Sequence, residues 1–289
     1  MQTADLRQWI DRREVMAAVL TPVPAAALAA TLDRDASEPA AGALLPPLWH
    51  WLYATPVERQ SELDVDGHVR RGGFVPPIAL PRRMWAGGRL EYHHPLRIGE
   101  HIVRTSRITA IREVEGRSGP LVFVTVLHET ANQLGVALSE EHDIVYRDMP
   151  RAGQVSQPKH APTDETFARE IVPDPVLLFR YSALTFNGHR IHYDRPYATE
   201  TEGYPGLLVH GPLIATLLAD LARRQRPDAT VRRFEFKALH PLFDIHRFHV
   251  CGRDTGTHAS DLWARDHEGH LAMQARIEYL ENAGAASAD

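Results

Sequence analysis

The sequence predicts an α+β fold in which one structural unit is used twice. Two runs end in the same tripeptide, His94-Pro95-Leu96 and His240-Pro241-Leu242, and each is followed by strand-like segments. Residues 149–165 lie between these runs, are rich in proline and polar side chains, and show no periodicity, which is typical of a linker. A chain of 289 residues can bury a core in each of two units. We therefore expect an N-terminal unit over 1–155 and a C-terminal unit over 165–289.

Both units close with a predicted antiparallel hairpin. In the second, the turn His267-Glu268-Gly269 separates two runs, and the apolar residues of the second run occupy every other position, from Leu271 to Tyr279. In the first, residues 132–135 form the expected turn, and apolar residues again fall on alternate positions. Two unrelated strand runs are the alternative, because the proline match between the copies is weak by itself.

A helix is predicted before the strands of the second unit. Its apolar stripe, with a 3.6-residue period, comprises Leu213, Ile214, Leu217, Leu218 and Leu221. Pro212 at its start and the basic pair at 223–224 are typical of the two ends of a helix. The first unit offers only a shorter and more aromatic counterpart at 45–56. Each unit is thus predicted to be one helix packed on an antiparallel sheet.

Composition excludes several classes of protein. The net charge of −5 and the absence of a Lys/Arg block argue against nucleic acid or an acidic membrane as partner. The longest apolar stretch, 206–222, is interrupted by His210, Pro212 and Asp220 and is too short to span a bilayer. The first fifteen residues have no signal-peptide pattern, and the single cysteine, Cys251, cannot form an internal disulfide or a cysteine-based metal site. A soluble cytoplasmic protein is the expectation.

The first candidate site is a polar loop within 179–198. It contains Asn187, His189, His192 and Asp194 within eight residues, and Asn187 with the following glycine is a turn signal. Histidine titrates near neutral pH, so a loop histidine beside a cleft is suited to donate and accept protons. A hydrogen-bonded surface loop is the alternative.

Two further segments are candidates for binding. In 203–213, Gly211 precedes the helix start, and its backbone N–H could hold a developing oxyanion; a simple N-cap or packing glycine is the alternative. In 80–89, Arg82, Arg83 and Arg89 accompany a double glycine, which suits a flexible phosphate-binding loop or, equally, a solvated surface.

The segment FNGHRIHYDRPYA, followed by GYPGLLVHGPL, resembles the MaoC-like hydratase family. The fuller wording of 180–221 is most similar to a branch that contains mesaconyl-CoA and itaconyl-CoA hydratases and the fungal mitochondrial 3-hydroxyacyl-thioester dehydratases. This resemblance implies a double hotdog fold, with two sheets around central helices, and a thioester of CoA or acyl-carrier protein as substrate. It covers most of the chain and is poor over the first 45 residues.

The resemblance also implies site residues. The family's catalytic histidine falls on His192 and its oxyanion glycine on Gly211, which follows His210 in a His-Gly helix start. The family's aspartate falls on Asn187, and its asparagine falls on His189, so this chain departs from the family at both positions. An amide can orient a water or a carbonyl but cannot take up a proton. The first unit lacks both motifs, so one active site per chain is expected, with the first unit supplying walls.

The implied reaction is reversible addition of water to an enoyl thioester. Gly211 would bind the thioester oxygen, His192 would move the proton, Asn187 would position the water, and either His189 or Asp194 would orient the imidazole. The expected substrate is a short branched dicarboxylic acyl-CoA of the mesaconyl-CoA or itaconyl-CoA type, with a 3-hydroxyacyl thioester as the alternative. Its carboxylate or the CoA phosphates would need a cationic partner; the candidates are Arg82, Arg83, Arg89, Arg180, Arg190 and Arg195. The resemblance implies neither a metal nor a redox cofactor, and CoA enters only as part of the substrate. A homodimer is compatible with the family.

Two other classes of function stay open on the sequence. His192-Tyr193-Asp194 is an HxD triplet that could bind iron together with a distant histidine such as His249 or His258. A hotdog protein that binds acyl thioesters without catalysis is the second alternative, because position 187 carries an amide.

Overall fold

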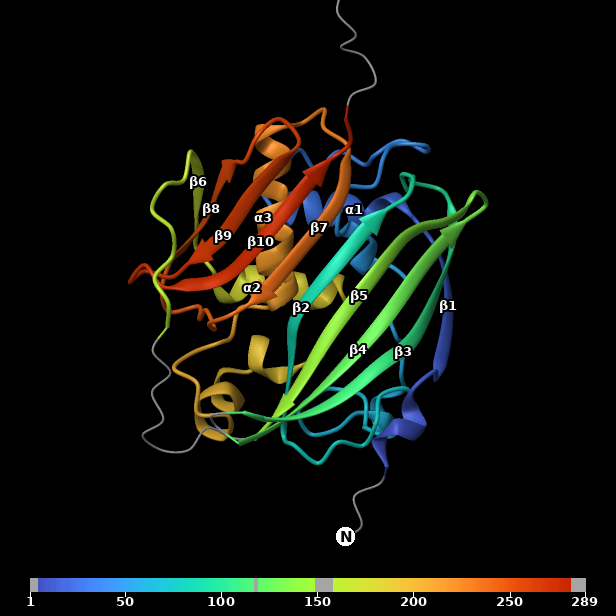
Figure 1. Ribbon diagram of the computed structural model, residues 1–289, viewed down its shortest axis with the longest axis vertical. Helices are drawn as coiled ribbons and strands as arrows, with labels where there is room; N and C mark the ends of the chain where they lie inside the picture. Colours follow the sequence, from blue (N-terminus) through green and yellow to red (C-terminus); the bar gives the residue numbers. More distant parts are fainter. Residues whose placement is uncertain (1–4, 117–118, 149–157, 282–289) are drawn as a thin grey trace, which may run out of the picture.

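The computed structural model describes residues 5–116, 119–148 and 158–281. Ten strands form one antiparallel sheet in the order β1-β3-β4-β5-β2-β7-β10-β9-β8-β6 (Figure 1). Their bounds are β1 Arg13–Val19, β2 Arg82–Tyr92, β3 His101–Gly116, β4 Gly119–Asn132, β5 Gly135–Arg147, β6 Phe167–Ile171, β7 Val231–Ala238, β8 Phe248–Asp254, β9 Ala259–Arg265 and β10 Leu271–Tyr279.

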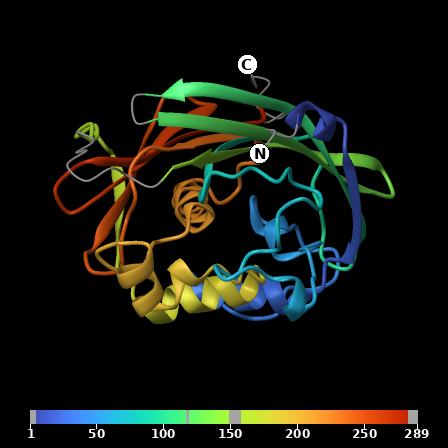
Figure 2. The same cartoon turned by 90° about the horizontal axis from the view of Figure 1, so that it is seen from below.

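Three α-helices accompany the sheet: α1 Pro22–Thr31, α2 Pro175–Leu184 and α3 Gly211–Gln225. Short helical turns occupy Leu6–Trp9, Trp49–Leu52, Gln60–Glu62, Arg190–His192 and Tyr197–Thr201. In Figure 2 the sheet arches over α3, which is seen end-on, while α1 and α2 close the open side of the arch. The longest of these helices has 15 residues, and no helix in the described ranges is long and apolar enough to cross a membrane.

The internal repeat is visible in the strand order. Outward from the centre, the first five strands run β2-β5-β4-β3-β1 and the second five run β7-β10-β9-β8-β6, which is the same order of elements. The two His-Pro-Leu segments make equivalent bonds, since the His94 N–H donates to the Ala137 carbonyl and the His240 N–H to the Ala272 carbonyl. The α+β prediction and the repeat are therefore confirmed. The expected linker at 149–165 falls mostly outside the described residues.

The two halves join where β2 pairs with β7, from Gly87 opposite Lys237 to Glu91 opposite Arg233. A Cβ on Gly87 would lie 2.6 Å from the Phe236 carbonyl oxygen, and one on Gly88 would lie 2.8 Å from the Phe236 ring. Glycine is needed here because a neighbouring backbone and ring approach closely. The expectation of a flexible loop at 80–89 is therefore wrong: the double glycine belongs to a strand at the centre of the sheet.

The central helix differs between the halves. In the second half the predicted helix is present as α3, and the predicted apolar stripe is buried. The helix is enclosed on its other faces as well, since all ten residues from Leu213 to Ala222 are buried. In the first half the predicted counterpart at 45–56 contains only the single turn Trp49–Leu52. The buried carboxylate of Glu140 holds this turn, because His50 Nε2 lies 2.9 Å from it and the indole of Trp51 donates to it at 3.0 Å. Burial alone would raise the pKa of Glu140, but the His50 hydrogen bond lowers it to about 2.

Two helices were not anticipated: the second half has two α-helices instead of the expected one, and the α-helix of the first half lies at 22–31 and not at 45–56. Helix α1 follows β1 and helix α2 follows β6, at matching places in the two halves. The carboxylate of Asp174 caps α2 by accepting from the Leu177 N–H at 2.8 Å, and Pro175 begins the helix. The segment 179–198 therefore begins within this helix, and the predicted polar loop with Asn187 follows the end of the helix.

We expect Gly87→Ala to destabilise the protein strongly, because its Cβ would meet backbone at the junction of the two halves. The melting temperature should fall by several degrees or the variant should fail to fold, which circular dichroism measures. Gly73→Ala is the matched control, since nothing lies within 4 Å of a Cβ at that position. Equal melting temperatures for the two variants would show that the junction tolerates a side chain.

Candidate active site

A cavity of about 610 Å³ lies between the two halves of the molecule. Strands β2 and β5 form one wall, and the other is formed by the 187–192 loop, the start of α3, and the segments next to β7 and β10. The polar lining residues are Asp66, His68, Arg82, Arg83, His142, Arg147, Asn187, His189, His192, Glu202, Tyr204, Lys237 and His240. Both halves therefore contribute to one cavity.

His192 is buried at the inner end of the polar loop, in a short helical turn. Its Nδ1 lies 2.7 Å from the Leu208 carbonyl oxygen, so Nδ1 carries the proton and Nε2 keeps its lone pair. The ring stacks on that of His210, with centroids 3.7 Å apart and planes at 17°. Burial lowers the pKa of His192 to about 4. At neutral pH it is a neutral imidazole suited to accept a proton.

The group that orients His192 was predicted incorrectly. Asp194 instead pairs with Arg190 at 2.7 Å and accepts from the Tyr197 N–H, and it makes no hydrogen bond to the imidazole of His192. His189 meets His192 edge to face, with ring centroids 5.4 Å apart and no hydrogen bond between them. The group that orients the His192 ring is the backbone carbonyl of Leu208. A motif of side chains cannot predict it, because every residue has a backbone carbonyl.

His210 forms the floor under His192. Its Nε2 lies 2.8 Å from the Ser182 hydroxyl on α2, while its Nδ1 is buried with no hydrogen-bond partner among the described residues. Burial lowers the pKa of His210 well below its ordinary value. This ring is therefore neutral, and the stack places two uncharged imidazoles next to the first turn of α3.

Gly211 is the first residue of α3 and lines the cavity. The first N–H groups of a helix have no intrahelical partner and lie at the positive end of the helix dipole. A Cβ on Gly211 would meet nothing closer than the Trp85 carbonyl oxygen at 3.9 Å. Close packing within the protein therefore does not explain why position 211 is a glycine. Without a Cβ at this position, a ligand can approach the Gly211 N–H closely.

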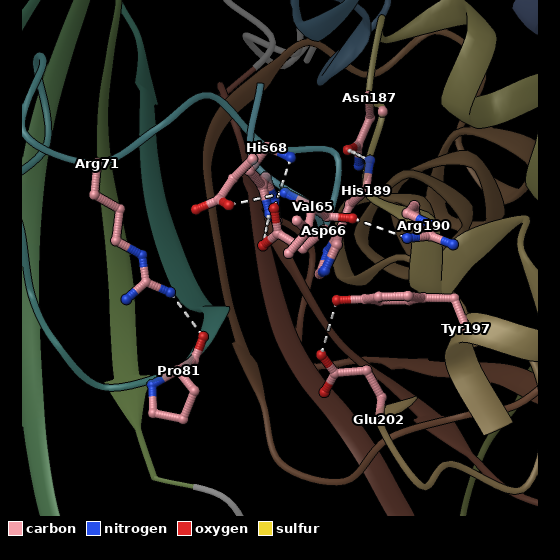
Figure 3. Close-up of polar contacts among 12 residues, drawn as sticks. Val65, Asp66, His68, Arg71, Pro81, Asn187, His189, Arg190, Tyr197 and Glu202 are labelled. Carbon is pink, nitrogen blue, oxygen red and sulfur yellow. Dashed lines mark hydrogen bonds and ion pairs between the residues drawn. The ribbon is translucent and has the colours of Figure 1, made fainter. Parts of the chain in front are cut away.

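Asn187 also lines the cavity, and its side chain shapes the loop. Its Oδ1 accepts from the His189 N–H at 3.1 Å, which is a turn-stabilising contact (Figure 3). The amide Nδ2 makes no hydrogen bond among the described residues and can donate to a water or a carbonyl.

The sequence prediction missed Asp66 and His68, which enter the site from the first half. Their loop lies against the catalytic loop, and Figure 3 shows both side chains beside His189. The dipeptide Asp66-Gly67 is a turn signal, but nothing in the local sequence connects that turn with residues 187–192. Only the folded structure brings the two loops together.

Two of the six candidate arginines line the cavity. Arg82 is committed to Glu202, through an ion pair at 3.4 Å and a bond to its carbonyl at 2.6 Å, and it lies over the Tyr204 ring. Arg83 has no carboxylate partner within the described residues. Its charge contributes, after burial, to lowering the pKa of His68. An uncompensated cation therefore faces the histidine end of the cavity.

The other four arginines do not reach the cavity. Arg89 pairs with Glu141 and Asp143 on neighbouring strand β5. Arg180 is exposed on α2. Arg190 bonds to Asp194 and lies 4.1 Å over the Tyr197 ring, and Arg195 pairs with Asp244. Their positions give no support to the expectation that they bind a substrate in this cavity.

The HxD iron site is not assembled. Asp194 pairs with Arg190, and His249 lies on β8 near Glu170, 3.8 Å away. His258 belongs to the turn between β8 and β9. Over the described ranges, the groups with metal-ligand spacing are Asp66, His68 and His189, and Asp266, Glu268 and His270. Neither contains His192 or Asp194.

A neutral histidine, an open helix N–H and a cation in one cavity define an acid–base enzyme acting beside a carbonyl oxygen. Comparison with known proteins agrees with this class. Residues 48–244 match the family described as hydroxyacyl-thioester dehydratase type 2. The mesaconyl-C(4)-CoA hydratase of Chloroflexus aurantiacus is 48% identical over 96% of this chain and 99% of its own length. The chain therefore belongs to this family and is a hydro-lyase.

Solved structures support the fold. A MaoC-like dehydratase from Phytophthora capsici matches with a TM-score of 0.69 and 14% identity, covering 94% of this chain and 97% of its own. A Mycobacterium tuberculosis protein described as having a double hotdog fold matches with a TM-score of 0.61 and 13% identity, covering 96% and 98%. The predicted double hotdog fold is confirmed.

The buried histidines should make folding stability depend on pH. Burial lowers the pKa of His128 and His192 to about 4 and that of His142 to about 3. In the unfolded chain these side chains bind a proton near pH 6.5, so below that pH the unfolded state binds more protons. The free energy of unfolding should therefore decrease between pH 6.5 and 4, by about 1.4 kcal/mol per pH unit for each such histidine.

Urea denaturation at pH 7, 6 and 5 measures this slope. His142→Phe should reduce this slope by about one proton, because the variant lacks one of the titrating imidazoles. Phenylalanine is a suitable replacement, since the His142 ring packs on the Trp85 ring with centroids 3.9 Å apart. An unchanged slope would mean that His142 does not stay neutral in the folded protein.

Proposed function

We propose that the protein adds water to a short branched dicarboxylic enoyl-CoA of the mesaconyl-C4-CoA type. The observation that carries the proposal is the presence of His192, the Gly211 N–H and Arg83 in one cavity. Together these groups meet the needs of an enoyl thioester that also has a free carboxylate. The 48% identity to a mesaconyl-C(4)-CoA hydratase over nearly the whole chain supports the same substrate.

The chemistry of this substrate sets the geometry. In mesaconyl-C4-CoA, which is 3-methylfumaryl-CoA, the double bond is conjugated with the thioester, and the β-carbon carries both the methyl group and the free carboxylate. Water therefore adds to the carbon that bears the carboxylate. A cation that recognises the carboxylate must lie close to the water-activating group, and not at the distant CoA end of the cavity.

Three groups of the cavity have proposed roles in the reaction. The Gly211 N–H holds the thioester oxygen as it gains charge, a contribution of roughly 3 kcal/mol for such donors. His192 Nε2 takes a proton from the water as its oxygen bonds to the β-carbon. Asn187 orients the water through its free amide hydrogens. The degenerate first unit lacks these motifs, so each chain has one such site.

Arg83 is the proposed carboxylate partner. It lines the cavity at the histidine end, whereas Arg82 on the same strand is occupied by Glu202. A guanidinium can bind a carboxylate through two parallel hydrogen bonds, which also fixes the orientation of the double bond.

A 3-hydroxyacyl thioester, of CoA or acyl-carrier protein, is the second candidate substrate. It is favoured by the family match over residues 48–244. The reaction is the same one run in the direction of dehydration, with an alkyl chain in place of the carboxylate. The two candidates differ in whether Arg83 contributes to recognition.

The proposed chemistry needs no metal or redox group, because it consists of proton transfer and enolate stabilisation. CoA enters as part of the substrate. A cytoplasmic location and a homodimer are also proposed, because the single cysteine needs no oxidising compartment and because hotdog proteins tend to associate. Light scattering on the purified protein measures the second of these.

His192→Ala should lose about 10²- to 10⁴-fold in kcat for hydration of mesaconyl-C4-CoA, because the proton acceptor is removed. Loss of the conjugated-thioester absorbance measures the rate, and circular dichroism confirms the fold. His267→Ala is the control, since His267 is exposed in the β9–β10 turn, where its ring stacks on that of His246, and it does not line the cavity. Wild-type turnover in His192→Ala would remove this residue from the mechanism.

Arg83→Met should change substrate choice. We expect kcat/KM for mesaconyl-C4-CoA to fall about 10- to 100-fold, while crotonyl-CoA, which has no carboxylate, is affected little. Arg89→Met is the matched control, because this arginine on the same strand pairs with Glu141 and Asp143 outside the cavity. If both substrates lose activity equally in Arg83→Met, the carboxylate is bound elsewhere.

A further inference from the structure

The loop that carries Asp66 and His68 is fixed to the catalytic loop of the other half. The Arg190 N–H donates to the Asp66 carbonyl at 2.9 Å, and the Arg190 guanidinium donates to the Val65 carbonyl at 3.0 Å. Gly67 has φ +88°, and a Cβ there would lie 1.9 Å from the Gly188 carbonyl oxygen. Only two glycines in contact allow the loops to approach so closely. The placement of Asp66 and His68 is therefore built into the fold.

Within this loop the two side chains form a hydrogen-bonded pair. Asp66 Oδ2 lies 2.9 Å from His68 Nδ1, and Asp66 Oδ1 accepts from the His68 backbone N–H at 2.9 Å (Figure 3). The carboxylate holds Nδ1 in its protonated form, so Nε2 is the nitrogen left for chemistry. His68 and His192 line the same cavity.

The charges of the pair differ from those around His192. Burial alone would raise the pKa of Asp66, but the hydrogen bonds and the charge of His68 lower it, so it is a carboxylate at neutral pH. Burial and the Arg83 charge lower the pKa of His68, and Asp66 opposes them. Among the described residues, the side-chain hydrogen bond of His192 goes to the neutral Leu208 carbonyl. A proton on His68 would therefore lie beside a carboxylate, whereas a proton on His192 would not.

Hydration needs two proton positions, one that takes a proton from water and one that gives a proton to the α-carbon. On the catalytic loop the amide of Asn187 cannot exchange a proton. His189 lines the same cavity, but burial and the neighbouring histidines lower its pKa, and no carboxylate of the described residues is hydrogen-bonded to its ring. Asp66 and His68 are an acid–base pair at the same end of the cavity.

We propose that His68, held and charge-compensated by Asp66, is the second acid–base group of the reaction, so that each half supplies one catalytic histidine. This inference rests on the proposed hydratase function. Asp66 is a positioning residue, because it acts through His68.

The step balances as follows in the direction of hydration. One O–H bond of water breaks and its proton goes to His192 Nε2, while the oxygen bonds to the β-carbon. The π electrons of the double bond move toward the thioester oxygen at Gly211. The enolate then collapses as His68, in its protonated form, gives the Nε2 proton to the α-carbon. An entering anionic substrate favours that protonated form.

The proton gained by His192 returns to His68 between turnovers. His189 is in ring contact with both, with centroids 3.9 Å from His68 and 5.4 Å from His192. In the reverse direction His68 removes the α-proton and His192 protonates the departing hydroxide. The two histidines have different environments, because His68 is hydrogen-bonded to a carboxylate and His192 to a carbonyl. Acid–base catalysis commonly uses two groups in different environments in this way.

The test compares His68→Gln, Asp66→Asn and Asp66→Glu with the wild type, using mesaconyl-C4-CoA, crotonyl-CoA and longer enoyl-CoAs. His68→Gln should lower kcat about 10²- to 10⁴-fold with little change in KM. Asp64→Asn is the matched control, an exposed aspartate of the same loop outside the cavity. Thermal unfolding verifies that each variant is folded.

The pH profile separates proton transfer from a structural role. In Asp66→Asn, His68 loses its carboxylate, so the alkaline limb of kcat/KM should move to lower pH by roughly 1 to 3 units. Asp66→Glu should restore part of the rate and of the profile. A merely structural role would lower kcat at every pH without moving the limb, and that result overturns the proposal.

Two other outcomes also decide the question. Full activity of His68→Gln alongside an active wild type overturns this inference alone, whereas inactivity of the wild type on the whole panel overturns the hydratase proposal and this inference with it. Asp66, His68 and His189 also have the spacing of a metal site. Stoichiometric bound metal, with activity lost to a chelator and restored by zinc or iron(II), would replace the acid–base role by a metal role.

Discussion

The pairing of β2 with β7 is the constraint on which the rest of the structure depends. It turns two five-stranded halves into one arched sheet, and the cavity lies on the concave side where the halves meet. Because Gly87 and Gly88 leave room for Phe236, the strands approach closely enough to pair at the centre. Arg83, which lines the cavity, lies on β2 four residues before this pairing begins. One strand therefore supplies both the junction of the halves and the cationic side chain of the cavity.

The two halves have diverged in a way that suits a shared site. The second retains a long enclosed helix whose first N–H opens into the cavity, whereas the first retains one turn anchored by Glu140. Between this turn and β2 the first half has only one further short turn, Gln60–Glu62, and the loop after it carries Asp66 and His68. The half without a long central helix thus supplies two polar side chains to the cavity.

The sequence predicted what depends on local pattern and missed what depends on distant contact. The alternating strands, the stripe of α3 and the His-Pro-Leu repeat are periodic features, and each has the expected structure. The polar loop identified His192, but its orienting group is a backbone carbonyl at Leu208, which leaves no trace in residue type. The glycines at 87 and 88 read as a flexible loop because flexibility and close approach favour the same residue. Helix α2 did have a signal, the capping Asp174 followed by Pro175, whereas nothing near Asp66 indicated its neighbours.

The contact between Gly67 and Gly188 has a consequence for how this chain can evolve. Each glycine excludes a side chain at the other position, so neither loop can change its backbone without the other. A steric condition between two residues far apart in the sequence therefore joins the two halves. Neither half can be exchanged for the corresponding half of a relative unless the partner loop is exchanged with it. The two loops must therefore be kept or exchanged together, although they are far apart in the sequence.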